Sequence, residues 1–195
     1  MPRRARHANG TTRPLAGCLV MIRGPFRFRR ALAQVFCALA LLSFVTAAPA
    51  QTPIPAQDFV QRTAIANMFG VESATLALRK TSSPAIKAFG HRLADDHATA
   101  MSGLRRIVAK RSDIALPDRP DAPHLALLSA LSDKQGADFD KAYIEAQRAT
   151  YRETAELMQR YASEGTDPEL KSFAVESLPV FRELQRKAQE LPNPP

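Results

Sequence analysis

The side chains best suited to chemistry are Glu72, Asp96 and His97, because carboxylates and an imidazole inside a helical protein are the ligands of iron and manganese sites. His97 lies in the apolar stripe of a helix predicted from residue 84 to 111, and Asp96 borders that stripe. Glu72 shares the apolar face of the preceding predicted helix, where a carboxylate is costly unless it is paired, hydrogen-bonded or bound to a cation. The spacing therefore predicts that these groups meet in the interior.

A complete di-metal site would need more ligands than these. Such a site takes a Glu from each of two helices and a Glu-x-x-His pair from each of the other two. Residue 94, three before His97, is alanine, the two later helices offer no inward histidine, and His124 falls in a connector. Three interpretations stay open: a di-metal site, a single weakly held cation, and a buried hydrogen-bonded network of Glu, His and Tyr, which the residue count favours.

The elements that must position these residues are helical. Apolar residues recur at steps of three or four, Ser83-Pro84 is a strong helix start, and no stretch alternates with period two for long enough to form a sheet. Helices are predicted, in order, at about residues 57–80, 84–111, 122–131, 137–164 and 168–191. The fold class is therefore all-α. Four long helices and a short extra helix in the connector predict a four-helix bundle made of two antiparallel hairpins.

The connector decides how the second hairpin is placed. Its short helix and extended residues can reach about 50 Å. A full-length crossover, as in ferritin-like bundles, is therefore possible, and an up-down-up-down arrangement stays open.

Residues 1–50 have the order of a secretory signal peptide. A basic region ends at Arg30, an apolar run covers residues 31–45, and Ala48-Pro49-Ala50 supplies small residues, which predicts cleavage after Ala50. Met21 is an alternative true start. The apolar run is shorter than the ~20 residues that span a bilayer, so an uncleaved anchor is the less favoured alternative and no transmembrane helix is expected in the mature chain. Residues 51–56 are then a flexible lead-in, 57–191 the helical domain and 192–195 a disordered tail.

Charge and cysteine positions limit the partners and the chemistry. Eight of the 27 Lys and Arg residues precede residue 51 and none of the 19 acids does, so the remainder is balanced and nucleic acid is not an expected partner. Cys18 and Cys37 both lie in the leader, so the mature chain has no disulfide and no thiolate. No glycine-rich phosphate loop, haem-attachment motif or supported Ser-His-Asp set is present. The sequence therefore favours a protein that is not an enzyme and has no cofactor.

A set of short motifs resembles a known family. They are, in order, Glu72, Ser82-Ser83-Pro84, Ile86-Lys87-Ala88-Phe89, Leu93-Ala94-Asp95-Asp96-His97, Leu116-Pro117, Phe139-Asp140-Lys141-Ala142-Tyr143, Asp167-Pro168-Glu169-Leu170-Lys171 and Leu178-Pro179. Together they resemble the bacterial exported domain of unknown function 4142, over nearly all of residues 58–191. The resemblance implies a ferritin-like fold and a periplasmic or outer-membrane address. It also implies a histidine in each of the last two long helices, at positions that are Tyr151 and Leu184 here.

Three functional hypotheses follow. The leading one is a periplasmic, ferritin-like helical bundle that acts as a non-catalytic binding or stress-related accessory protein. The alternative is a metal-dependent oxidase or metal-storage protein, with iron or manganese at a degenerate site of Glu72, Asp96 and His97. A third is a peripheral envelope protein, at the outer membrane or elsewhere, that assembles with a partner. The sequence leaves the ligand, the partner and the oligomeric state open.

Overall fold

The fold of the described residues, 52–193 in a computed structural model, is helical throughout, with no strand in that range. The helices are α2 (Ala56–Lys80), α3 (Pro84–Val108), α4 (Ala122–Ser132), α5 (Gly136–Glu164) and α6 (Pro168–Glu190). The predicted all-α class is confirmed, and each predicted helix is present, although α3 ends three residues earlier than expected. The predicted signal peptide lies outside the described residues and stays a prediction.

Helix starts follow from local sequence. Ser83, Asp121 and Asp167 each precede a helix and accept a hydrogen bond from the backbone N–H three residues further on. A proline stands at the first or second position of each of these helices, where the N–H has no partner within the helix. These caps fix the beginnings of α3, α4 and α6 independently of tertiary packing.

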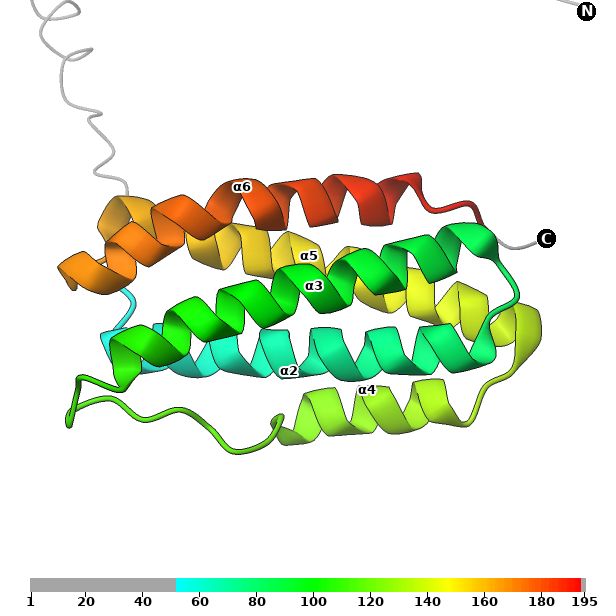
Figure 1. The fold of residues 1–195 in the computed structure, drawn as a ribbon, viewed down its shortest axis with the longest axis horizontal. Helices are drawn as coiled ribbons and strands as arrows, with labels where there is room; N and C mark the ends of the chain where they lie inside the picture. Colours follow the sequence, from blue (N-terminus) through cyan, green and yellow to red (C-terminus); the bar gives the residue numbers. More distant parts are fainter. Residues whose placement is uncertain (1–51, 194–195) are drawn as a thin grey trace, which may run out of the picture. The chain divides into compact units, whose positions relative to one another are not determined.

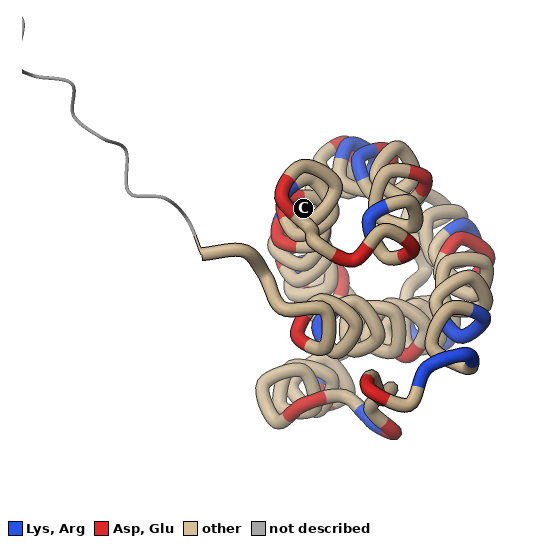
Figure 2. Tube along the Cα trace, turned by 90° about the vertical axis from the view of Figure 1, so that its left-hand side faces the viewer, with Lys and Arg blue, Asp and Glu red and all other residues tan. Residues whose placement is uncertain are grey.

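The four long helices lie side by side around a common core. α2 packs against α3 and α5, and α6 packs against the same two helices, so that α2 and α6 occupy opposite corners. The turns at residues 81–83 and 165–167 are short and make α2–α3 and α5–α6 antiparallel hairpins (Figure 1). α4 contacts α2 and α5 from outside, and it is the separate helix at the bottom of the end-on view in Figure 2.

The connector between the hairpins runs back along the helices. Figure 1 shows it leaving the end of α3, continuing through α4 and entering α5 at the opposite end, so α3 and α5 run in the same direction. Both of its ends are fixed by hydrogen bonds. Gln57 exchanges two bonds with the backbone of Ala115, and Lys80 Nζ donates to the carbonyls of Ser132 and Lys134. Residues near both ends of α2 therefore anchor the connector.

The inward face of α2 is lined by small residues. Thr63, Asn67, Gly70, Ala74 and Ala77 recur at steps of four and three and are all buried. Their spacing places them on one face of the helix. Small side chains there allow the neighbouring helices to approach closely, and Val71, on another face, is 41 % exposed.

No helix in residues 52–193 is both long enough and apolar enough to cross a membrane.

Candidate functional site

A hydrogen-bonded chain crosses the core and joins three of the long helices. The phenol of Tyr151, on α5, lies 2.7 Å from His97 Nε2, on α3. The other ring nitrogen, Nδ1, lies 2.7 Å from Asn67 Oδ1 on α2, and Asn67 Nδ2 donates at 2.9 Å to the carbonyl of Thr63. Each polar atom along this chain therefore meets a partner of matching kind.

The hydrogen bonds among Tyr151, His97 and Asn67 have one consistent donor-to-acceptor direction. Asn67 uses its amide N–H on the Thr63 carbonyl, so its oxygen faces His97 and can only accept. His97 therefore carries its proton on Nδ1, which donates to Asn67, and leaves the Nε2 lone pair free. Tyr151 O–H then donates to Nε2. The imidazole is thus held as a neutral ring whose two nitrogens are both occupied within the protein.

Burial reinforces that protonation state. His97 is 1 % exposed, and removal from water lowers its pKa from 6.5 to about 4 because the charged form loses its hydration. Tyr151 is completely buried, and its pKa lies well above 10 for the same reason, with smaller contributions from Tyr143 and Asp96. At neutral pH both groups are uncharged.

The space for the imidazole is provided by Gly70. A Cβ atom at this position would lie 2.2 Å from His97 Nε2 and 2.5 Å from Cδ2, which is far inside contact distance. Phe181 of α6 packs edge-on against the ring with centroids 5.8 Å apart, and Phe89 packs in the same way against Tyr151 at 6.1 Å. All four long helices therefore contribute to this layer.

The predicted ligands do not converge. Glu72, expected in the core, is exposed, because the buried face of α2 is the small-residue face and Glu72 points away from it. Asp96 is half-buried at the edge of α3 and pairs with Arg92 at 2.7 Å. Within residues 52–193, no three His, Cys, Asp or Glu side chains are grouped so that they could hold a metal ion together. Of the three candidates, only His97 lies in the interior.

The other two positions singled out by the resemblance are both buried. Tyr151 lies in the layer of His97 and supplies the tyrosine of the expected network. Leu184 on α6 is fully buried, one turn beyond Phe181. The network therefore exists, with Asn67 in the place expected for Glu72.

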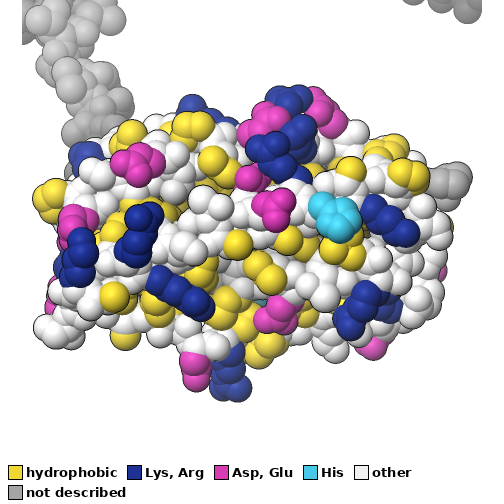
Figure 3. Space-filling model, viewed as in Figure 1, with side chains coloured by type: hydrophobic (Ala, Val, Ile, Leu, Met, Phe, Trp, Pro, Cys, Tyr) yellow, Lys and Arg dark blue, Asp and Glu magenta, His cyan; other side chains and the backbone are white. Residues whose placement is uncertain are grey.

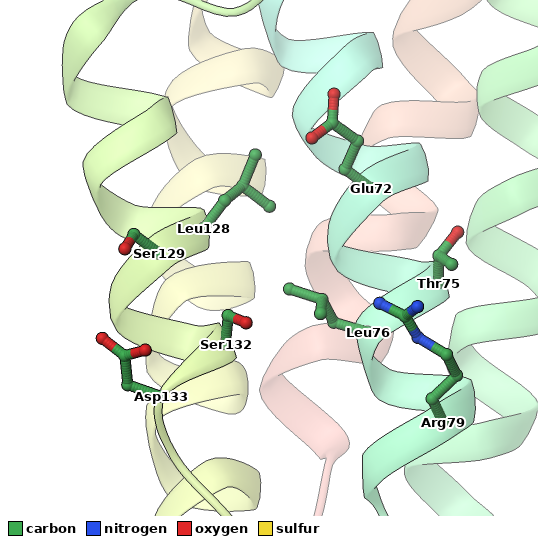
Figure 4. A pocket seen from close by; sticks show the side chains of 8 residues that line it. All are labelled: Glu72, Thr75, Leu76, Arg79, Leu128, Ser129, Ser132 and Asp133. Carbon is green, nitrogen blue, oxygen red and sulfur yellow. The ribbon is translucent and has the colours of Figure 1, made fainter.

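Glu72 lies instead in a surface groove between α2 and α4, shown in Figure 4. The groove has a volume of about 410 Å³, and Leu76 and Leu128 form its apolar part. Arg79, on the same side of α2, also lines it, and in the described part of the chain neither Glu72 nor Arg79 forms an ion pair. Asp133, at the end of α4, also lines the groove and forms no ion pair within residues 52–193. Two carboxylates and one guanidinium thus remain available beside the apolar side chains, with Glu72 and Arg79 two helical turns apart.

Sequence reasoning missed Asn67 and Gly70. The large apolar residues of α2 were taken to mark its core face, which pointed to Glu72. The signal that identifies the actual face is the run of small residues at steps of four and three, which predicts a close helix contact. Asn67 stands in the middle of that run, at the depth of His97.

A second buried polar group, Gln147 of α5, lies near this hydrogen-bonded network. Gln147 is fully buried and donates through Nε2 to Ser73 Oγ at 3.1 Å, and Ser73 donates to the Gly70 carbonyl. Gln147 Oε1 and the phenol of Tyr143 are buried without a hydrogen-bond partner. The middle of α5 is therefore polar inside the core.

Comparison with known proteins gives a family and no close relative of known function. No curated protein and no solved structure matches the chain. The family described as Domain of unknown function (DUF4142) matches residues 43–191, which is more than half of the sequence, and the chain therefore belongs to that family.

Proposed function

We propose that this chain is an exported, ferritin-like four-helix bundle that works as a non-catalytic binding protein in the bacterial envelope, and that it binds its ligand in the α2–α4 groove. The ferritin-like assignment is supported by the parallel directions of α3 and α5 and by the connector that spans the helices (Figure 1). Export is supported by the signal-peptide pattern of residues 1–50.

The observation that carries the non-catalytic proposal is the closed network at His97. Both ring nitrogens are engaged inside the protein, one with Asn67 and one with Tyr151. A general base or a metal ligand needs a lone pair that faces substrate or metal, whereas the Nε2 lone pair of His97 faces Tyr151 inside the protein and accepts its hydrogen bond. Its surroundings favour a structural role that holds α2, α3 and α5 in register.

The groove favours a small ligand that carries both charges. Glu72 suits an ammonium group and Arg79 suits a carboxylate, while Leu76 and Leu128 offer apolar contact between them. On the face drawn in Figure 3, basic and acidic side chains are interspersed, which does not suit a polyanion such as nucleic acid. A small zwitterion is the class that matches these charges.

NMR titration with 6-aminohexanoate tests the proposal, because its methylene chain separates the ammonium from the carboxylate widely enough to approach two groups two helical turns apart. Its N,N,N-trimethyl derivative serves as the matched probe, because it keeps the carboxylate but cannot donate a hydrogen bond to Glu72. We expect backbone shifts confined to the groove residues on α2 and α4, weakened by Glu72→Gln and by Arg79→Gln. Glu156→Gln, at an exposed position of α5, is the control that should leave binding unchanged. Shifts absent for every zwitterion tried, or unaffected by both groove variants, would remove the groove from the proposal.

Metal analysis tests the non-catalytic part separately. Protein purified without chelator or affinity tag should retain less than stoichiometric iron or manganese after dialysis. Retention of about two equivalents would favour the metal-dependent alternative. Mass analysis of the N-terminus of protein recovered from the envelope tests export, and a chain that begins at Gln51 is the expected result.

A further inference from the structure

We propose that Tyr151 and His97 form a redox-active pair, in which one-electron oxidation of the phenol is coupled to transfer of its proton to the imidazole. This inference goes beyond the binding function and does not depend on it. It concerns the buried hydrogen-bonded residues Tyr151, His97 and Asn67 rather than the groove.

The geometry provides the proton acceptor. Tyr151 O–H points at His97 Nε2 over 2.7 Å, a distance typical of a strong hydrogen bond. The Nε2 lone pair is free to take the proton because Nδ1 already carries one and donates it to Asn67. After transfer, His97 would donate from both nitrogens, to the Tyr151 oxygen and to Asn67 Oδ1. The product state therefore keeps every hydrogen bond of the reactant state.

The proton and electron leave by different routes. A one-electron oxidant of the outer-sphere class, such as an oxidised metal complex, takes one electron from the phenol ring. The O–H bond of Tyr151 breaks, its proton forms an N–H bond at His97 Nε2, and a neutral tyrosyl radical and an imidazolium result. A one-electron reductant restores the phenol as the proton returns.

The environment supports a charged His97 only for the lifetime of the radical. Burial lowers the pKa of the imidazole to about 4, so the proton returns once the tyrosyl radical is reduced to the phenolate. The nearest acid on the same helix is the adjacent Asp96, whose charge already acts on Tyr151 and which is shared with Arg92 at 2.7 Å. No Lys or Arg of residues 52–193 is buried in the core, so no fixed positive charge there opposes the transfer.

The other tyrosines of the protein are internal controls. The sequence has three tyrosines and no tryptophan, and all three tyrosines lie on α5. The phenol oxygens of Tyr143 and Tyr161 are buried without a hydrogen-bond partner, although both rings are as buried as that of Tyr151. Oxidation of Tyr143 would have to expel a proton with no acceptor, and Tyr161 is near the Asp167 carboxylate but forms no side-chain hydrogen bond with it. Of the three phenols, only that of Tyr151 is hydrogen-bonded to a base.

Flash photolysis tests the pair directly. The full chain, with Cys18 and Cys37 blocked by alkylation, is oxidised by photogenerated tris(bipyridine)ruthenium(III), and the radical is followed by transient absorption and EPR. We expect a tyrosyl radical that forms more slowly in D₂O. Tyr151→Phe should abolish most of the signal, whereas Tyr143→Phe and Tyr161→Phe should retain it.

His97→Gln separates a proton acceptor from a merely structural partner. The glutamine oxygen can still accept the Tyr151 hydrogen bond, but it is not a base. In protein shown to be folded by circular dichroism, we expect the radical to form at least about tenfold more slowly. A tenfold change in rate corresponds to ~1.4 kcal/mol in the barrier. A full signal in Tyr151→Phe, or an unchanged rate in folded His97→Gln, would overturn the proposal.

A further measurement covers the case in which those variants do not fold. In the double variant Tyr143→Phe/Tyr161→Phe, Tyr151 is the only tyrosine left, and its partners are untouched. High-field EPR should then show the lowered g component of a radical whose oxygen accepts a hydrogen bond. No radical, or one without that shift, would contradict the assignment.

Discussion

Replacing Gly70 by alanine tests whether the buried layer is packed as tightly as its geometry indicates. The added Cβ would lie 2.2 Å from His97 Nε2, so the ring must retreat by about 1 Å or more to reach ordinary contact distance. Nε2 is also the atom that accepts the 2.7 Å hydrogen bond from Tyr151. The ring cannot retreat from Gly70 without disturbing that bond, because α3 fixes where the side chain begins.

The expected cost combines three effects. Overpacking a tight core costs about 1–3 kcal/mol. A buried hydrogen bond that is broken and leaves both partners unpaired costs a further ~1–3 kcal/mol. Alanine is the better helix former by about 1 kcal/mol, which offsets part of this loss. We therefore expect Gly70→Ala to lower the free energy of unfolding by about 3 kcal/mol, within a range of roughly 1–5 kcal/mol.

Gly90→Ala is the matched control, because Gly90 is also a buried glycine inside a long helix. A Cβ there would lie 3.6 Å from the Ala74 carbonyl and from Leu78, which is ordinary contact. This variant should gain up to about 1 kcal/mol from helix propensity. Urea unfolding followed by circular dichroism measures both. If Gly70→Ala were as stable as Gly90→Ala, the close approach of Gly70 to His97 would be refuted.

Three further predictions concern the same framework. As pH falls from about 6.5 to about 4, His97 takes up a proton in the unfolded chain but stays neutral in the folded protein, so the free energy of unfolding should fall by up to about 3 kcal/mol. His97→Gln should flatten that part of the pH profile, measured by urea unfolding. Arg148 donates to the carbonyls of Ala188, Gln189 and Leu191 at the end of α6, so Arg148→Met should speed hydrogen exchange in the last turn of α6 and cost about 1–2 kcal/mol. Asp167→Ala removes the cap of α6 and should lower the thermal midpoint, at a cost of about 1 kcal/mol.

The helices were predictable because their signals are local. A capping side chain followed by proline marks the starts of α3, α4 and α6, and these positions are read from a few adjacent residues. The end of α3 was placed too late, at Arg111 rather than Val108. Lys110 and Arg111 suit a last helical turn electrostatically, but the chain there leaves the helix and Arg111 pairs with Asp113 and Asp167 instead.

The interior was predictable in part. His97 lies in an apolar stripe whose period is unambiguous, so it was placed correctly in the interior, where the structure buries Tyr151 as well. Asn67 and Gly70 were missed because α2 carries apolar residues on more than one face. Large side chains such as Met68 and Leu76 suggested one phase for the helix, and the small residues determine another.

Asn67 is buried and Glu72 is exposed because of the size of the two side chains more than because of their polarity. Where two helices approach closely, the facing positions must be small, and a glutamate there would have to bury both its length and its charge. An asparagine is short enough to fit beside Gly70 and can supply an acceptor to His97 without any charge. A neutral imidazole with its proton on Nδ1 needs one such acceptor on one side and one donor on the other. The donor comes from Tyr151, at the position where the resemblance implies a histidine, and its O–H completes the hydrogen-bonded chain.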